Sequence, residues 1–226
     1  MLGATTWYYE FDEAGNMRLK KDDQYSPTVT YEWEYNSENR LTAYDGPNAS
    51  NDATYSYNAV GNRVQTVVGG VAKKFLFDGA DCVADYDNSV SLLAYYVTPG
   101  MDENLLMRAD SADHYYAQDG LGSVRSIIDT SQAVTHKYDY SAWGEQIAWE
   151  TATGAPENRY SFTGREWDGE SQSYSLRYRS LFPAIGCFEQ RDPLAYIRPR
   201  GYLLDWGNPN MYDIGHGGLS SQPYGI

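Results

Sequence analysis

Short aromatic stretches alternate with polar residues and end at glycine-containing turns along much of this 226-residue chain. Alternating residues lie on opposite faces of a β-strand, so the aromatic side chains of one stretch share a face. An Asp or Asn then tolerates turn geometry, and a following Gly supplies a positive φ. The four clearest copies are Tyr9-Glu10-Phe11-Asp12, Trp33-Glu34-Tyr35-Asn36, Tyr55-Ser56-Tyr57-Asn58 and Phe75-Leu76-Phe77-Asp78.

The Asp or Asn that closes each copy recurs at a regular spacing. Positions 12, 36, 58 and 78 are separated by 24, 22 and 20 residues. Asp119 lies 41 residues after Asp78, which equals two steps, and Ser141 follows 22 residues later. A repeat of about 20 residues fits two strands and two turns, which is one β-hairpin. A single hairpin cannot bury its apolar face, so neighbouring hairpins must pair side by side.

The repeat therefore predicts an all-β fold, a coiled antiparallel sheet of hairpins, because strands twist. Residues 101–108 fit either a short helix or a further strand, and the repeat count favours the strand. An open sheet leaves its first strand, near residues 7–11, without a neighbour, and exposed strand edges recruit other strands. We expect the partner to be further repeats of a longer shell, or a second copy of the chain.

Composition narrows the expected partners. Lys and Arg total 17 against 31 Asp and Glu, a net charge of −14, which disfavours nucleic acid and anionic membrane surfaces. No apolar stretch reaches the roughly 18 residues that a membrane span needs. The first residues lack the basic and apolar regions of a signal peptide. They open directly into an aromatic stretch, so we expect an internal start within a longer protein.

The hairpin units resemble YD-repeats, which are named for their Tyr-Asp signature. Three motifs in the second half resemble the RHS repeat-associated core domain and occur in its order. Residues 115–125 resemble an aromatic pair followed by a D-x-L-G-S-V-R turn, residues 162–168 resemble F-T-G-R-E-Y-D, and residues 186–194 resemble G-R-F-x-x-R-D-P-L. The chain is thus similar to RHS/YD-repeat proteins over nearly its whole length.

The resemblance implies a hollow β-cocoon whose end is closed by an inward-spiralling plug. We expect YD repeats over residues 1–110, the RHS core domain over 111–195 and a degenerate tail over 196–226. In the family, the shell encloses a C-terminal effector in many polymorphic toxins, and it also occurs in insecticidal toxin complexes and teneurin adhesion proteins. The resemblance implies a structural shell segment that encloses or presents a C-terminal polypeptide, needs no cofactor, and belongs to a secreted or cell-envelope protein.

Family members carry two Asp-Pro motifs that are thought to form an aspartyl autoprotease, and this chain departs from that pattern. Asp192 fits the first aspartate, since two close carboxyl groups can share a proton and act as acid and base. Ile214 stands where the second aspartate belongs, and Asp213 fills that role only if the register slips by one residue. The peptide bond that this self-cleavage would break lies near Leu219. We expect this activity to be impaired, with Asp192 starting a turn, and no enzymatic role for the chain.

Other ligand-binding patterns are incomplete. Gly120-Leu121-Gly122 lacks the third Gly of a phosphate loop, so a hairpin turn is favoured. An acidic cluster lacks the loop Gly and the terminal Glu of a calcium-binding hand, so solvated turn charges are favoured. Three histidines have no second ligand at metal spacing, so surface or turn positions are favoured. The acidic cluster is Asp78, Asp81, Asp85 and Asp87, and the histidines are His114, His136 and His216.

Two alternatives remain open for the aromatic residues and the cysteines. Flat aromatic rings stack on sugars, so a carbohydrate- or cell-surface-binding module competes with rings that pack inside the coil. The exposure of Trp33, Trp143 and Trp149 separates these alternatives. Cys82 and Cys187 either pair or stay free, and free buried thiols are favoured.

Overall fold

A computed structural model describes residues 6–100 and 103–193. They form two antiparallel sheets, of 14 and four strands, and the predicted all-β class is confirmed. The large sheet comprises β1 (Tyr8–Phe11), β2 (Met17–Lys21), β3 (Thr30–Tyr35), β4 (Leu41–Asp45), β5 (Ala53–Tyr57), β6 (Arg63–Val68), β7 (Val71–Asp78), β8 (Asp81–Asp87), β9 (Leu92–Val97), β10 (Leu106–Ala109), β11 (Ala112–Gln118), β12 (Val124–Asp129), β13 (Val134–Tyr140) and β14 (Gln146–Thr151). The small sheet comprises β15 (Glu166–Asp168), β16 (Ser173–Leu176), β17 (Arg179–Phe182) and β18 (Cys187–Phe188).

Helical structure in the described residues is confined to three single 3₁₀ turns. These are η1 (Ala49–Asn51), η2 (Phe162–Gly164) and η3 (Pro183–Ile185). None of the helices in this part of the chain has the length and apolar character that crossing a membrane requires.

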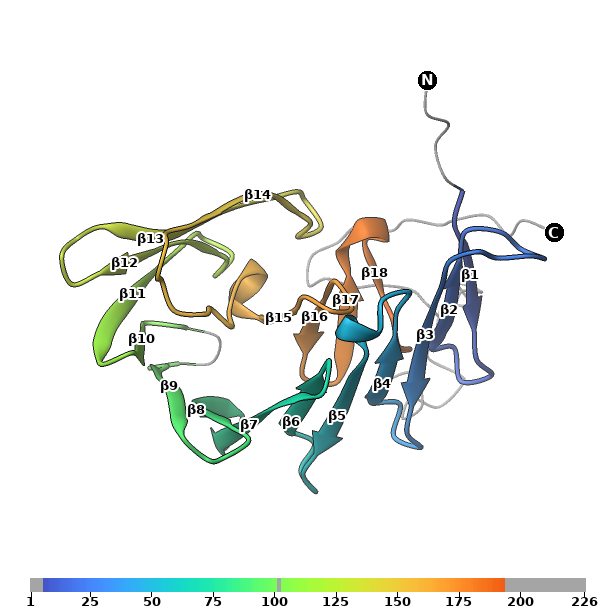
Figure 1. Cartoon of the computed structure of the whole chain (residues 1–226), viewed down its shortest axis with the longest axis horizontal. Coiled ribbons are helices and arrows are strands. Elements are labelled where there is room, and N and C mark those ends of the chain that lie inside the picture. The colour runs from blue at the N-terminus through green and yellow to red at the C-terminus, as the bar shows by residue number, and fades with distance from the viewer. Residues whose placement is uncertain (1–5, 101–102, 194–226) are drawn as a thin grey trace, which may run out of the picture.

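The large sheet is a meander that coils around the small one. Each strand pairs with its neighbours in sequence, from β1 to β14 without a crossover. In Figure 1 the blue and teal strands β1–β6 form one arm, and the green and yellow strands β8–β14 form the other. The small orange sheet, β15–β18, lies between the two arms. The coil follows from strand twist and confirms the predicted architecture.

One turn geometry explains the repeat. In five hairpins, the Asp, Asn or Ser after the aromatic stretch accepts a hydrogen bond on its side chain from the backbone N–H four residues later. The distances are 2.8 Å at Asp12, 3.0 Å at Asn36, 2.9 Å at Asn58, 3.0 Å at Asp119 and 3.1 Å at Ser141. In each turn, the residue three positions after the Asp, Asn or Ser has a positive φ, and this residue is Gly in every case except Asn39. Each turn carries a bulge, as in hairpins with a left-handed residue before the second strand.

The remaining hairpins on this edge use other turns. Asp78 pairs directly with Asp81 across a tight turn in which Gly79 has a φ of 61°. The hairpin between β9 and β10 lies between Asp78 and Asp119, where the spacing predicted a further repeat. Of the predicted strand at residues 101–108, only the last three residues belong to β10, and residues 101 and 102 lie outside the described residues. The same side-chain bond also closes turns on the opposite edge, at Asp87 and Asp129, which the repeat did not indicate.

The apolar core lies between the large sheet and the C-terminal segment that it surrounds. One cluster combines β2–β5 with a side chain of β17, and a second combines β9–β13 with a residue just before β15. Four of the seven residues of the first cluster and three of the eight residues of the second are aromatic, and alternation along the strands places such side chains on one face. The first cluster contains Met17, Trp33, Leu41, Tyr44, Ala53, Tyr55 and Phe182. The second contains Ala94, Tyr96, Met107, Ala109, Val124, Ile127, Tyr138 and Tyr160.

The sheets divide the chain at a different place from the predicted domains. The predicted boundary between residues 110 and 111 falls within the turn of the β10–β11 hairpin, so the large sheet runs straight through it. The change from the large to the small sheet lies between Thr151 and Glu166. The division into repeats and core domain stays a prediction, and the tail at 196–226 lies outside the described residues.

Candidate functional site: the anchored plug

Residues 152–193, called the plug below, are tied to the large sheet by backbone hydrogen bonds at both ends. Near its start, Ala152 N–H donates to Thr135 O over 2.8 Å. Near its end, Met17 N–H of β2 donates to Glu189 O over 2.7 Å. The plug therefore connects the last strand of the sheet back to its first hairpin. It closes the coil from inside, as an inward-turning end piece would.

A buried ion pair joins β6 to β15. The Arg63 guanidinium donates two hydrogen bonds to Asp168, at 2.6 and 2.8 Å, and a third to Glu166, at 2.6 Å. Burial alone would lower the pKa of Arg63, but these carboxylates raise it well above its usual value. Arg63 thus stays charged, and its planar fork matches both acids.

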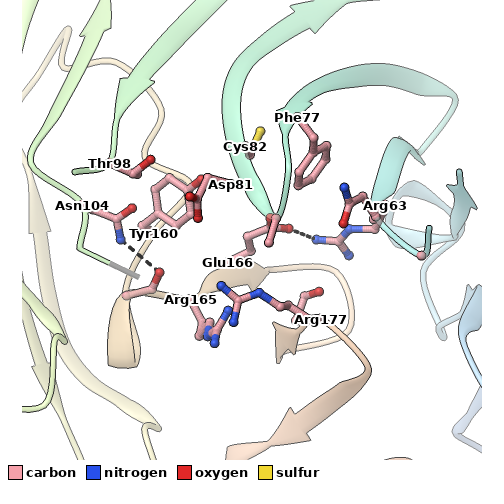
Figure 2. A pocket seen from close by; sticks show the side chains of 15 residues that line it. Arg63, Phe77, Asp81, Cys82, Thr98, Asn104, Tyr160, Arg165, Glu166 and Arg177 are labelled. Carbon is pink, nitrogen blue, oxygen red and sulfur yellow. Dashed lines mark hydrogen bonds and ion pairs between the residues drawn. The ribbon is translucent and has the colours of Figure 1, made fainter. Parts of the chain in front are cut away.

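A second guanidinium extends the network to the other arm. Arg159, in the plug, contacts Asp85 of β8 at 2.9 Å and Glu166 at 2.7 Å. It also lies 3.8 Å over the ring of Phe75. Burial would raise the pKa of Glu166, but Arg159 and Arg63 lower it to about 2. Glu166 is thus ionised at neutral pH and bridges two arginines (Figure 2 shows Arg63 reaching it).

The network holds more acids than bases. Burial raises the pKa of Asp168 in spite of Arg63. Burial and the Asp168 charge raise the pKa of Glu170, whose carboxyl accepts a 2.7 Å hydrogen bond from the Tyr55 hydroxyl. Buried charges need partners of good geometry. Arg63 and Arg159 are the cations that pair with Glu166, Asp168 and Asp85 in this network.

Two cavities flank this network. The larger, of about 630 Å³, lies between the sheet and the plug and is lined by charged residues of the network together with apolar residues such as Phe75 and Tyr96. The smaller, of about 60 Å³, is shown in Figure 2. There Asn104, at the end of the β9–β10 connection, donates a 3.0 Å hydrogen bond to Gly164 O of the plug. The larger space is enough for part of another polypeptide.

The structure places only part of the predicted aspartyl pair. Asp192 forms an ion pair of 3.2 Å with Arg179 of β17, and its side chain is partly exposed. Asp213 and the predicted cleavage position, Leu219, lie outside the described residues. The pair thus stays a prediction.

Several other expectations are corrected. His114 and His136 are buried strand residues, not surface or turn residues; His216 lies outside the described residues. Burial lowers the pKa of His136, whose ring stacks on Tyr138. Asp85 is also not a solvated turn charge, since it is buried against Arg159. No group of three acidic, histidine or cysteine side chains in the described part of the chain is arranged to hold a metal.

The structure partly decides two alternatives that the sequence left open, the location of the tryptophan rings and the pairing of the two cysteines. Trp33 is 2% exposed, whereas Trp143 and Trp149 are 48% and 64% exposed. Interior packing therefore explains the first ring but not the other two. Cys82 and Cys187 do not form a disulfide; the Cys82 thiol is buried, and Cys187 is only partly buried. Gly122 lies in a hairpin turn, which confirms the interpretation of the incomplete phosphate loop.

Sequence reasoning missed the residues that anchor the plug. Glu166 and Asp168 belong to the motif at residues 162–168, which was used only as a family signature. Arg63 directly follows a turn, and Arg159 precedes the motif by three residues. A charged residue at an inward strand position is a signal for such a pair, because buried charges are almost always partnered.

Comparison with curated proteins gives sequence relatives of known name, while no family model matches the chain. Over 192 residues, or 80% of the chain, it is 31% identical to the tRNA3(Ser)-specific nuclease WapA of Bacillus spizizenii. It is 30% identical over the same length to the tRNA nuclease WapA of Bacillus subtilis. The chain spans only about 8% of the length of these relatives.

These names correct one expectation from the sequence. The expectation of no enzymatic role is contradicted, because the relatives are named as nucleases. Their names also give tRNA as the substrate. The net charge of this chain disfavours nucleic acid for this segment, and that argument does not apply to the rest of these longer proteins.

Comparison with solved structures shows the fold. The Photorhabdus luminescens Tc holotoxin pore with a mutated TccC3 matches with a TM-score of 0.57 and 14% identity. The TcdB2–TccC3–Cdc42 complex matches with a TM-score of 0.55 and 13% identity. Each match covers 83% of this chain and 12% of the other. The chain thus has the antiparallel β-sheet fold of the Tc toxin shell, and its sequence relatives support the resemblance to RHS/YD-repeat proteins.

Proposed function

We propose that this chain is the C-terminal shell segment of a longer RHS/YD-repeat toxin, where it closes one end of a cocoon that encloses a C-terminal polypeptide. One observation carries the proposal. The plug turns back into the coil and is fixed there by buried arginines that reach both arms of the sheet. A fold that only presented a surface would not need such an internal anchor.

The remaining parts of the proposal concern the longer protein. Strand β1 pairs only with β2 among the described residues, so upstream repeats would continue the sheet from this edge. We extend the nuclease activity in the relatives' names to the full-length protein, with tRNA as substrate. A secreted or cell-envelope location follows from the family resemblance. Cleavage of tRNA by the purified full-length protein tests the first of these extensions.

Encapsulation is tested by protection from protease. In the full-length protein, the enclosed polypeptide should resist added protease while the shell is closed. Arg63→Met breaks the anchor between β6 and β15, so we expect the enclosed polypeptide to be digested faster. Arg108→Gln is the matched control, because it removes an exposed arginine that pairs with Asp113. Equal digestion of the wild type and Arg63→Met would refute the proposal.

A second function is favoured by one observation on β14. Ile147 and Trp149 are 63% and 64% exposed on the last strand of the sheet. An exposed indole ring offers a flat face for a sugar, so carbohydrate or cell-surface binding is the second candidate. A glycan array with the wild type and Trp149→Ala tests it. Sugar binding that Trp149→Ala abolishes would favour this function.

The aspartyl pair is tested by intact mass. If Asp192 and Asp213 act together, the chain should yield a product that ends at or next to Leu219 after incubation at mildly acidic pH. Asp192→Asn should abolish that product. A single intact mass in both proteins would remove the pair from consideration.

A further inference from the structure

Glu189 occupies a junction between the plug and the first hairpins of the sheet. It follows β18 directly and is 0% exposed. Its backbone N–H donates to Ser180 O of β17 over 2.8 Å, and its carbonyl accepts from Met17 N–H of β2 over 2.7 Å. A single residue therefore joins β17 of the plug to β2 of the large sheet, with one backbone group bonded to each strand.

The Glu189 side chain lies in a pocket without a cation. Neither carboxyl oxygen has a hydrogen bond of standard geometry, and no ion pair of Glu189 occurs among the described residues. Ser173, Ser180 and Trp33 lie close enough to lower its pKa in part. Burial, and next the charge of Asp168, raise that pKa to about 8.

The titratable groups that face Glu189 do not favour its ionised form. Asp168 faces it from β15, Tyr35 from β3 and Tyr44 from β4. All three are neutral or negative, so none neutralises a carboxylate. Two cations of this interface have other contacts: Lys20 lies over the Phe182 ring and Arg179 over the Phe188 ring.

We propose that Glu189 is a latch that weakens as the pH rises. Its neutral form holds β18 between β2 and β17, and loss of its proton to solvent base releases β18 from the sheet. An uncompensated charge in such a site is strongly unfavourable. Local opening exposes the carboxylate to water and requires less free energy than unfolding of the whole chain. The latch goes beyond encapsulation, since it sets the condition under which the plug is held.

The direction of the pH effect follows from linkage. The ordinary Glu pKa of 4.5 is raised to about 8 in the folded protein. The contribution of Glu189 to stability is therefore complete below pH 4.5 and is lost as the pH rises toward 8. Opening therefore becomes more favourable with each pH unit between about 4.5 and 8, and it stops changing above pH 8, where Glu189 is ionised in both the closed and the open form.

Amide hydrogen exchange of the full chain at pH 5 to 9 tests the latch, with Glu189→Gln as the variant that stays neutral. After correction for intrinsic rates, the protection of the Met17 amide in the wild type should fall by up to about tenfold per pH unit between pH 5 and 8 and should level off above pH 8. It should stay constant in Glu189→Gln. Glu150→Gln, which removes an exposed carboxyl group of β14, should behave like the wild type.

A second readout does not depend on opening. At pH 7 the wild type should show an infrared band of a buried protonated carboxyl group that is missing in Glu189→Gln, with unchanged near-UV circular dichroism in the variant. Constant Met17 protection in the wild type from pH 5 to 9 would overturn the latch. An equal loss of protection in Glu189→Gln, or no difference in the infrared band, would overturn it as well.

Discussion

Arg63 and Asp168 form a bidentate ion pair, with N–O distances of 2.6 and 2.8 Å, across 105 positions of sequence. Arg63 starts β6 in one arm of the coiled sheet, and Asp168 ends β15 in the plug. Both side chains are almost completely buried. The pair therefore fixes the position of the plug inside the coil, and its loss should lower the stability of the whole fold.

Arg63→Met should destabilise the chain strongly. The change leaves Asp168 without its guanidinium partner and leaves Glu166 with Arg159 alone. Removal of one partner from a buried pair costs about 3–5 kcal/mol. Urea unfolding at pH 7 measures the free energy of unfolding. Arg108→Gln, which breaks an exposed pair with Asp113, should leave the midpoint nearly unchanged, and equal shifts in the two variants would contradict the anchoring role.

Glu166 should make the fold sensitive to acid. Its pKa is lowered from 4.5 to about 2, so its contribution to stability is present above pH 4.5 and is lost as the pH falls toward 2. The shift corresponds to about 3 kcal/mol. Glu166→Gln should therefore be less stable at pH 7 and should lose less stability between pH 5 and 2. Denaturant midpoints across this range measure both effects, and parallel pH profiles would refute the assignment.

The sequence carried enough information for the sheet but not for its closure. The spacing from Asp12 to Ser141 predicted one hairpin per repeat, because each hairpin is a local structure with its own turn chemistry. Alternation also predicted that the aromatic residues of one stretch, such as Tyr55 and Tyr57, share a face of the sheet. Neither signal reports which distant residues meet, so the contact of Arg63 with Asp168 and the burial of His136 were not predicted. Only the tertiary packing of the plug determines them.

Trp149 should account for much of the quencher-accessible fluorescence of the chain. It is 64% exposed, whereas Trp33 is 2% exposed within the core. Trp149→Phe should lower the accessible fraction in an acrylamide titration, while Trp33→Phe should raise it, because a protected ring is lost. If the accessible fraction is the same in both variants, the assignment of inner and outer rings is wrong.

Gly144→Ala should test how tightly the plug packs against the sheet. Gly144 lies in the β13–β14 turn with a φ of 89°, and an added Cβ would lie 2.5 Å from the Phe162 ring of the plug. Gly154→Ala is the matched control, since Gly154 has a φ of 79° and an added Cβ would meet no atom within 4 Å. Both variants carry the strain of a positive φ, so the difference between them reports the clash alone. Overpacking of this kind costs about 1–3 kcal/mol, and we expect Gly144→Ala to be less stable than Gly154→Ala by that amount in thermal or urea unfolding.

Phe162→Leu should recover part of the difference in the Gly144→Ala background, because the smaller side chain leaves room for the methyl group. Equal stability of the two glycine variants would mean that the plug moves away from the turn without cost, and it would contradict a plug that is firmly held inside the coil.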